Sequence, residues 1–398
     1  MKPGAQLHCH RTSWKGRNCY VLGNSLVRLK ILMGGGHIAE FRLNGQSGGA
    51  GVNPLWVPPW RTIEPYRYRG QIHSKEYGTS VEGKCLSGIA GHSLCLDYFG
   101  LPSQEEVKQG LSLHGEAPSA KWTKKGLSIS GKRVRLSVAV ELPLAGLNFG
   151  RAIEIRKGET VAYFHEVVEN ARRMDHFFNW AQHVTLGPPF LSQKDAIITL
   201  SGSKAKSFCH GYDEGKALLA SARIFRWPLA PLMQGGLVDL SHPFPTDGLG
   251  FVVAVLMDRN REFGFIAATN YKLGLVVAYC FKRRDFPWVT VWEENRTISA
   301  PPWKNRTRAR GLEFSTTPFP TTRHEAFNLG ECFGESTLTH VPALACKTVR
   351  YAGFLAHVPS DFGCVKDIDV EHNQFLLHGS KSKRPIAILA SGAEDLIE

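Results

Sequence analysis

The sequence predicts an all-β protein built as a large antiparallel β-sandwich. From residue 126 onward, runs in which apolar and polar residues alternate, such as 133–142, 152–169 and 249–257, are separated by turns that contain glycine or proline. This alternation is typical of strands with one face in a core and one face in water. Helical periodicity never extends beyond a few turns. Stacked antiparallel sheets are therefore favoured over a parallel α/β core.

We expect one large domain over residues 1–398. All-β sandwiches often exceed about 200 residues as one unit, and the 43% hydrophobic and 21% charged residues are those of an ordinary globular protein. No apolar run is long enough to cross a membrane, and the N-terminal segment lacks the apolar stretch of a signal peptide. These features predict a cytoplasmic protein without a membrane partner.

Cysteine spacing and charge exclude other classes. The nine cysteines show no Cys-x-x-Cys spacing, so neither a metal site nor a disulfide framework is expected. The net charge of +13 would permit nucleic-acid binding, but the basic residues are dispersed, with local clusters at 281–286 and 381–384. A solvated basic surface is the favoured interpretation, with no nucleic-acid partner.

The N-terminal region predicts the first strands of the sandwich. Val27, Leu29 and Ile31 alternate with polar residues, and a turn at Gly34–Gly36 follows them. A triple glycine can also cradle phosphates, but that use needs a helix directly after it, whereas residues 37–44 predict a strand. Farther along, residues 103–110 predict a short helix with Ser103 as its cap and Glu106 three residues on.

Two histidines occupy well-marked positions. His114 follows Leu111 and Leu113 and precedes Gly115, which predicts a strand whose last polar side chain points above the sheet. His183 lies in an apolar, strand-like run that ends at Gly187-Pro188-Pro189. Imidazole exchanges protons near neutral pH, so two that converge on one cavity could act as a general acid and its electrostatic helper. The alternative for either is a structural or surface role, since the chain has 16 histidines.

The succession of motifs around these histidines resembles the galactose mutarotase (aldose 1-epimerase) superfamily. Leu113-His114-Gly115 is followed by Trp122, then by an arginine-bearing strand, a hairpin, a strand end at Asn170 and finally His183. The resemblance runs in order over about residues 30–325. It implies the sandwich fold of that superfamily and an isomerase that interconverts the anomers of a small free carbohydrate. No metal and no organic cofactor are implied.

Ring opening needs a base as well as an acid, because the anomeric hydroxyl loses a proton while the ring oxygen gains one. Gly311-Leu312-Glu313 resembles the late strand that carries the family's glutamate base. The resemblance therefore implies Glu313 as base, His183 as the acid that protonates the ring oxygen, and His114 as a hydrogen-bond donor beside it. Glu293 and Glu294 are the alternatives for the base.

The proline-rich loop at 52–70 is a plausible rim for a sugar site. Trp56 or Trp60 could stack on a pyranose while Arg61 or Arg67 donates hydrogen bonds to hydroxyls. The alternative is that these residues only pack a long connection.

Other substrate contacts follow from the resemblance. Trp292 and Glu293 lie in a run, 292–295, that is similar to a strand end of the family. The family's aspartate has its candidates in Asp239, His242 and Asp247, of which we select Asp239. Its arginine has no clear equivalent: His92 stands near the expected position, and Arg61 lies earlier.

The residues are also compatible with two other functions. One is a non-catalytic carbohydrate-binding protein, which the poor match at the arginine and aspartate positions supports. The other is a sugar hydrolase or lyase on the same sandwich, because fold alone does not fix chemistry. A hydrolase would need two carboxylates, which Glu313 with Glu293 or Glu294 could supply.

Overall fold

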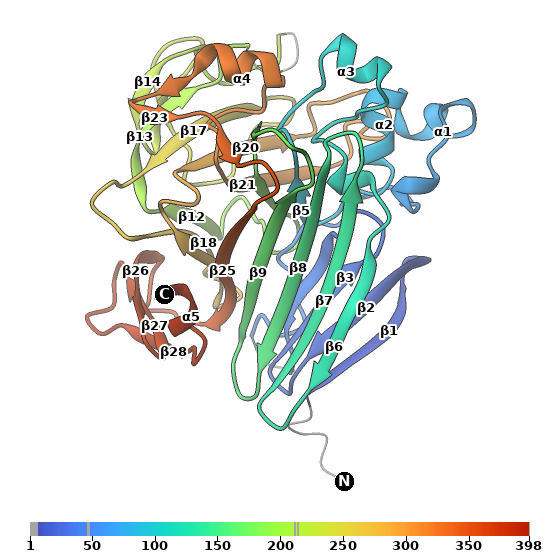
Figure 1. The fold of residues 1–398 in the computed structure, drawn as a ribbon. Coiled ribbons are helices and arrows are strands. Elements are labelled where there is room, and N and C mark those ends of the chain that lie inside the picture. The colour runs from blue at the N-terminus through green and yellow to red at the C-terminus, as the bar shows by residue number, and fades with distance from the viewer. Residues whose placement is uncertain (1–6, 46–47, 211, 213–214, 398) are drawn as a thin grey trace.

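The computed structural model describes residues 7–45, 48–210, 212 and 215–397. Two large antiparallel sheets dominate this part of the chain, one of 13 strands and one of 8. The long strands β6–β9 of the smaller sheet face β1–β3 of the larger one (Figure 1). The all-β, antiparallel sandwich predicted from the alternating runs is therefore confirmed.

Counted from one edge to the other, the strands of each sheet do not follow the order of the chain. The larger sheet contains β1 (His8–Trp14), β2 (Arg17–Gly23), β3 (Val27–Leu32), β4 (Ile38–Leu43), β5 (His92–Cys95), β11 (Ala181–Leu186), β21 (Arg308–Ser315), β20 (Trp288–Asn295), β17 (Phe251–Met257), β13 (Gly202–Ser207), β14 (Ile224–Arg226), β15 (Leu229–Pro231) and β16 (Leu237–Asp239). The smaller sheet contains β12 (Ala196–Leu200), β18 (Phe263–Asn270), β19 (Leu275–Lys282), β25 (Cys346–His357), β9 (Val161–Asn170), β8 (Leu147–Arg156), β7 (Arg133–Leu142) and β6 (Thr123–Ile129).

The remaining elements are short. They are the sheet of β26 (Val365–Glu371), β27 (Gln374–Gly379) and β28 (Ile386–Leu389), the pairs β10 (His176–Phe178) with β24 (Thr339–Val341) and β22 (Glu331–Cys332) with β23 (Glu335–Ser336), the helices α1 (Gly70–Tyr77), α2 (Ser80–Leu86), α3 (Gln104–Lys108), α4 (Arg323–Leu329) and α5 (Glu394–Ile397), and the 3₁₀ turns η1 (Pro65–Arg67) and η2 (Ala117–Ser119). Within the described ranges, no helix is long and apolar enough to cross a membrane. The cytoplasmic location and the single domain stay predictions.

Of two local secondary-structure predictions, one is confirmed and one is wrong. The helix predicted near residue 103 is α3, and Ser103 and Glu106 form its capping box. The strand predicted to end at His114 is wrong, because residues 111–114 form coil and a turn. The chain reverses there: His114 has a φ of 64° and Gly115 one of 82°. These left-handed conformations cannot continue a strand.

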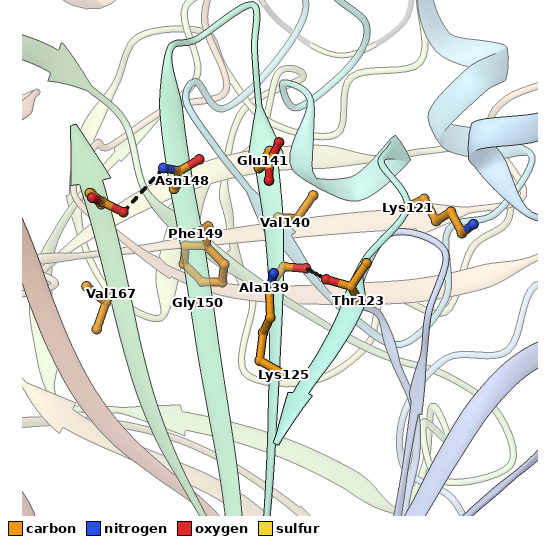
Figure 2. Close-up of a pocket in the computed structure, with 11 residues that line it drawn as sticks. Lys121, Thr123, Lys125, Ala139, Val140, Glu141, Asn148, Phe149, Gly150 and Val167 are labelled. Atoms are coloured by element: carbon orange, nitrogen blue, oxygen red, sulfur yellow. Dashed lines mark hydrogen bonds between the residues drawn. The ribbon is translucent and has the colours of Figure 1, made fainter. Parts of the chain in front are cut away.

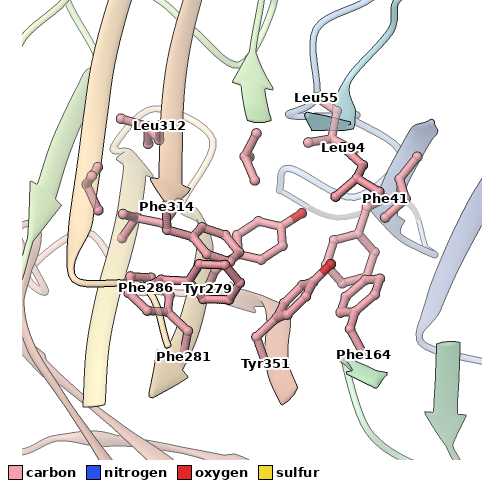
Figure 3. Close-up of a cluster of buried hydrophobic side chains, with 14 of the residues drawn as sticks. Phe41, Leu55, Leu94, Phe164, Tyr279, Phe281, Phe286, Leu312, Phe314 and Tyr351 are labelled. Carbon is pink, nitrogen blue, oxygen red and sulfur yellow. The ribbon is translucent and has the colours of Figure 1, made fainter. Parts of the chain in front are cut away.

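The main core fills the space between the two sheets, and aromatic rings join them. Phe314 of β21 stacks on Phe281 of β19 with ring centroids 4.5 Å apart, and Phe164 of β9 stacks on Tyr351 of β25 at 4.6 Å. Phe314 also meets Tyr351 edge to face at 5.2 Å. Figure 3 shows these rings converging from opposite layers. Offset and edge-to-face aromatic pairs add to the free energy gained by burial.

A fully buried polar network crosses the same interface. Nε of Arg151 (β8) donates to Oε1 of Glu166 (β9) at 2.6 Å, and neither side chain is exposed. Gln182 of β11, in the opposite sheet, donates to the second oxygen of Glu166 at 2.6 Å and accepts from Arg151 at 3.2 Å. The Tyr351 hydroxyl donates to Glu166 at 2.8 Å. Every member thus has a partner, as buried charges require.

The triple glycine turns the chain between β3 and β4 and serves packing. A Cβ at Gly36 would lie 2.4 Å from the Trp122 ring, so only glycine fits under that indole. The carbonyl of Gly36 accepts from Arg151 at 3.0 Å, and that of Gly34 accepts from Arg17 at 2.8 Å. The strand β4 follows directly, where a phosphate-binding turn would need a helix.

A second core lies on the outer face of the eight-stranded sheet. Phe354 of β25 stacks on Phe375 of β27 at 5.0 Å, and Val276, Ile368 and Leu396 are buried around them. The three-stranded sheet and α5 therefore cover the part of this face formed by β18, β19 and β25. The last strands of the chain complete the fold on the side opposite the main core.

The buried network generates a stability prediction. Glu166→Gln keeps the side chain's size but leaves the Arg151 charge uncompensated, and removal of one partner of a buried pair costs about 3–5 kcal/mol. We expect a loss of that order in the free energy of unfolding, measured by denaturant and thermal melts. Asp247→Asn, which breaks the partly exposed pairs with Arg296 and Arg308, should cost at most about 1 kcal/mol. Equal losses in both variants would contradict the role given to the network.

Candidate active site

His183 and Glu313 come from neighbouring strands of the larger sheet. In the antiparallel register of β11 with β21, His183 lies directly opposite Glu313. Directly opposed residues project to the same face of a sheet. Because side chains alternate along a strand, Gln182 points into the main core while His183 points away from it. The sheet register alone therefore brings an imidazole and a carboxyl together.

The side chains of His183 and Glu313 lie in contact but do not form a hydrogen bond with each other. Nε2 of His183 lies 3.0 Å from Oε1 of Glu313, but this oxygen makes no hydrogen bond of acceptable geometry. Nδ1 of His183 is 2.9 Å from the Thr185 hydroxyl, two residues along the same strand. The site thus contains a buried carboxyl oxygen that lacks a partner, which is costly unless a ligand supplies one.

Gly311 makes room for the Glu313 carboxyl. A Cβ at position 311 would lie 2.2 Å from Oε1 of Glu313 and 3.2 Å from the Trp292 ring. The two residues share a face of β21 because they are two positions apart. The Gly-Leu-Glu sequence therefore has a steric reason: any larger side chain at 311 would displace the carboxyl.

His114 is positioned by a loop. Its backbone N–H donates to the Gly100 carbonyl at 2.8 Å, and the Gly100 N–H donates to Nδ1 of His114 at 3.2 Å. Because Nδ1 accepts, the neutral ring carries its proton on Nε2. A Cβ on Gly115 would lie 2.1 Å from the Leu96 carbonyl oxygen, so the glycine after the histidine is required.

The three groups share one environment. The ring centroids of His114 and His183 are 5.2 Å apart, and Phe99 packs against both rings. Burial lowers the pKa of His183 to about 4 and, with the charge of His183, lowers the pKa of His114 well below its ordinary value. Burial also raises the pKa of Glu313 well above its ordinary value. Perturbed groups gathered in a cleft mark a candidate functional site.

These groups line a cavity of about 200 Å³. This is smaller than the roughly 300–1,000 Å³ of sites for drug-sized ligands and suits a compact molecule. Its walls are mostly apolar and aromatic. The lining residues are Trp56, Glu82, Leu86, Ile89, Phe99, Leu113, His114, His183, Thr185, Val252, Trp292, Ile298, Trp303, Glu313 and Pro320.

Only part of the predicted rim loop lines the cavity, and other residues of the loop pack behind that part. Trp56 lines the cavity, whereas Trp60 packs edge to face behind it at 5.4 Å and donates its indole N–H to the Leu86 carbonyl at 3.0 Å. Arg61 does not reach the cavity. It lies in a separate hollow with Arg67 and Arg69.

His92 and Asp239 also lie away from the cavity. His92 is fully buried in the main core, where its Nε2 is 2.9 Å from Oε1 of Gln182. It therefore extends the network of Arg151 and Glu166. Asp239 ends β16 and accepts from the Ser241 hydroxyl at 2.7 Å. Neither residue lines the cavity.

Trp292 lines the cavity, whereas the next two residues of β20, Glu293 and Glu294, do not. Glu293 pairs with buried Arg310 and accepts from the Phe244 N–H at 2.8 Å. Glu294 accepts from the Tyr212 hydroxyl at 2.6 Å and from the N–H of Ile298 at 3.1 Å. Both alternatives for the base are thus held in structural contacts.

Sequence reasoning missed several lining residues. Thr185 could have been found, since it follows His183 by two residues in a strand and so shares its face. Phe99, Trp303 and Glu82 come from loops and α2, far from the histidines in sequence, and carried no signal. In the described part of the chain, no group of three His, Cys, Asp or Glu side chains is arranged to hold a metal ion.

A wider hollow of about 590 Å³ lies over β6–β9 (Figure 2). It is lined by Lys121, Lys125, Glu141, Asn148 and neighbouring strand residues, and it contains no histidine. The smaller cavity, with its three perturbed groups, is therefore the better candidate for chemistry.

The comparisons with known proteins concern structure. No model of a known protein family and no curated protein sequence matches the chain. Among solved structures, a Klebsiella pneumoniae protein provisionally named aldose 1-epimerase aligns with a TM-score of 0.62 at 15% identity, over 90% of this chain and 89% of that one.

Two further structures agree with the first. A galactose mutarotase-like protein from Clostridium acetobutylicum aligns with a TM-score of 0.58 at 13% identity, over 89% of this chain and 99% of that one. An Escherichia coli K12 protein, provisionally named aldose 1-epimerase, aligns with a TM-score of 0.52 at 14% identity, over 89% of this chain and 100% of that one. At this identity the likeness concerns the fold: the chain has the galactose mutarotase-like fold that its motifs resemble.

Proposed function

We propose that the protein is an aldose 1-epimerase-like isomerase that interconverts the anomers of a free aldose. The observation that carries the proposal is the convergence of His114, His183 and Glu313 on one small cavity, with His183 and Glu313 3.0 Å apart. The names of the similar structures from Klebsiella and Escherichia support the same activity. Tryptophan walls also suit a pyranose, whose C–H faces pack on indole rings.

The acid and the base share a single proton. Burial favours the neutral forms of both groups, so in the proposed mechanism the pair begins with one transferable proton, on Glu313, beside a neutral His183. The facing atoms lie 3.0 Å apart but are not aligned for a hydrogen bond, so the bound sugar has to align them before the proton moves. The transfer from Glu313 to His183 then makes a carboxylate and an imidazolium without changing the net charge. This ion-pair form has the base and the acid that ring opening needs.

The reaction then proceeds in balanced steps. The Glu313 carboxylate takes the proton of the anomeric hydroxyl, and the imidazolium of His183 gives its proton to the ring oxygen. The bond between the anomeric carbon and the ring oxygen breaks, and an aldehyde forms. Rotation of the aldehyde group followed by the reverse transfers closes the ring with the opposite anomeric configuration. His114, whose Nε2 carries a proton, donates a hydrogen bond to the ring oxygen or a neighbouring hydroxyl.

A second candidate is a carbohydrate-binding protein without catalysis. It is favoured by the small number of polar groups in the cavity lining. Binding alone would not require His183 and Glu313 to meet as buried groups with opposite pKa shifts. A purified protein that binds a sugar without speeding anomer exchange would establish this candidate.

Glu313→Gln should abolish most of the activity. The amide keeps the shape of the site but cannot accept the proton, and general base catalysis is worth about 10² to 10⁴ in rate. We expect a fall of that size in kcat, with His183→Asn similar and His114→Asn less damaging. The readout is the rate of anomer exchange for a panel of aldoses, followed by polarimetry or NMR above the uncatalysed background. A Glu313→Gln variant as fast as the wild type would assign the base to another group.

The shared proton predicts a bell-shaped pH dependence of kcat/KM. Below about pH 4, the lowered pKa of His183, the pair takes up a second proton and loses its base. Above the raised pKa of Glu313 the pair loses its proton and with it the acid, so the rate falls again. Rates corrected for background and measured across this range test the prediction. A rate that rises steadily into the alkaline range would show that Glu313 acts alone as an ionised base.

The two tryptophans of the rim loop should behave differently. Trp56→Ala removes a cavity wall and should raise KM, whereas Trp60→Ala should mainly lower stability, by about 3–5 kcal/mol, because Trp60 is a packed residue outside the lining. KM and melting temperature are measured for both. An unchanged KM in Trp56→Ala would argue against sugar stacking on this ring.

A further inference from the structure

The lining of the catalytic cavity is unusually poor in groups that could hold sugar hydroxyls. Among the described residues that line it, the polar side chains are Glu82, His114, His183, Thr185 and Glu313. No lysine, arginine, aspartate, asparagine or glutamine of the described chain belongs to the lining. Sites that recognise polar ligands place such groups at fixed points of an otherwise apolar wall.

Most of these polar groups are already engaged in the reaction. His183 and Glu313 serve the ring oxygen and the anomeric hydroxyl, and His114 donates beside them. The Thr185 hydroxyl is bonded to Nδ1 of His183. Glu82, on α2, is the one described polar side chain of the lining that is assigned neither to the reaction nor to a contact with a reacting group. A hydroxyl that loses water without gaining a partner costs about 1–3 kcal/mol.

Two of the three tryptophans that line the cavity direct their indole N–H groups into the protein. The indole N–H of Trp56 points to the Thr307 hydroxyl at 2.8 Å, and that of Trp292 points to the Tyr212 hydroxyl at 3.1 Å. The ring centroid of Trp303 lies 5.8 Å from that of Trp56 and 6.0 Å from that of Trp292. The indole donors of Trp56 and Trp292 are thus used within the protein, so these walls offer apolar ring surface to the ligand.

The lack of a cation in the cavity disfavours anionic sugars. Among the described residues of its lining there is no lysine or arginine. A phosphate or uronate group placed there would lose water without gaining a cationic partner, which costs binding free energy. Arg61, Arg67 and Arg69 lie in a separate hollow.

We propose that this site selects a neutral aldose with few hydroxyl groups: a deoxy sugar, or one with alkyl substituents away from the anomeric carbon. The proposal rests on the proposed function of the same cavity. An apolar methyl or methylene group would lie against the tryptophan and leucine walls, where it gains burial. The parent hydroxyl at that position would lose its water without gaining a partner.

The test compares matched pairs of sugars: D-galactose with D-fucose, its 6-deoxy form, and D-glucose with D-quinovose, with glucose 6-phosphate as the anion. Anomer exchange is measured at equilibrium by NMR, and binding to Glu313→Gln by calorimetry. We expect kcat/KM to be about ten- to hundredfold higher for each deoxy sugar than for its parent. Glucose 6-phosphate should remain at the background rate.

Two substitutions test whether the apolar wall causes the preference for deoxy sugars. Val252→Thr adds a hydroxyl to the wall and should narrow the preference for the deoxy sugar. Val167→Thr adds the same hydroxyl on the other sheet, in the hollow over β6–β9, and should leave the preference unchanged.

The outcomes separate the two proposals. Exchange of the parent sugars or glucose 6-phosphate as fast as that of the deoxy sugars overturns the substrate class and leaves the epimerase standing. No exchange of any sugar, with deoxy sugars bound more tightly than their parents, overturns the epimerase and retains the ligand class. Neither exchange nor binding of the deoxy sugars overturns both.

Discussion

The buried ion pair of Arg151 and Glu166 is the constraint on which the site depends. Two charges without exposure are tolerated because Gln182, Tyr351 and the Gly36 carbonyl complete their hydrogen bonds. Gln182 reaches this pair across the sandwich and is followed directly by His183. A strand whose one face is tied into the opposite sheet cannot rotate or slip by a residue. The polar core therefore sets the direction in which the imidazole points.

The chemistry is divided between rigid and adaptable parts of the molecule. The sheet supplies His183, Thr185 and Glu313 from paired strands, whereas loops and short helices supply His114 and most of the walls. Burial shifts the pKa values of His183 and Glu313 in opposite directions. Paired strands hold reacting groups more accurately than loops do. Loops can therefore change the ligand while the proton-transfer geometry stays the same.

The sequence predicted the fold well, because alternation along a strand is a local property that survives in the structure. It placed His114, His183 and Glu313 only through the order of motifs. Whether Arg61, His92 or Glu293 faces the cavity depends on partners distant in sequence, such as Gln182 for His92 and Arg310 for Glu293. The turn at His114 was missed because nothing local distinguishes it from a strand end. Thr185 was recoverable from strand periodicity alone.

The position of β25 has a consequence for how the chain is made. This strand lies between β19 and β9 inside the eight-stranded sheet, although it is synthesised after almost every other element. Until it emerges, β9 and β19 each present an unpaired edge, which invites association with other chains. Pairings so distant in sequence also form slowly. A nascent chain or a fragment that ends before residue 346 consequently has two unpaired strand edges in the interior of the sheet, in addition to those at its two ends.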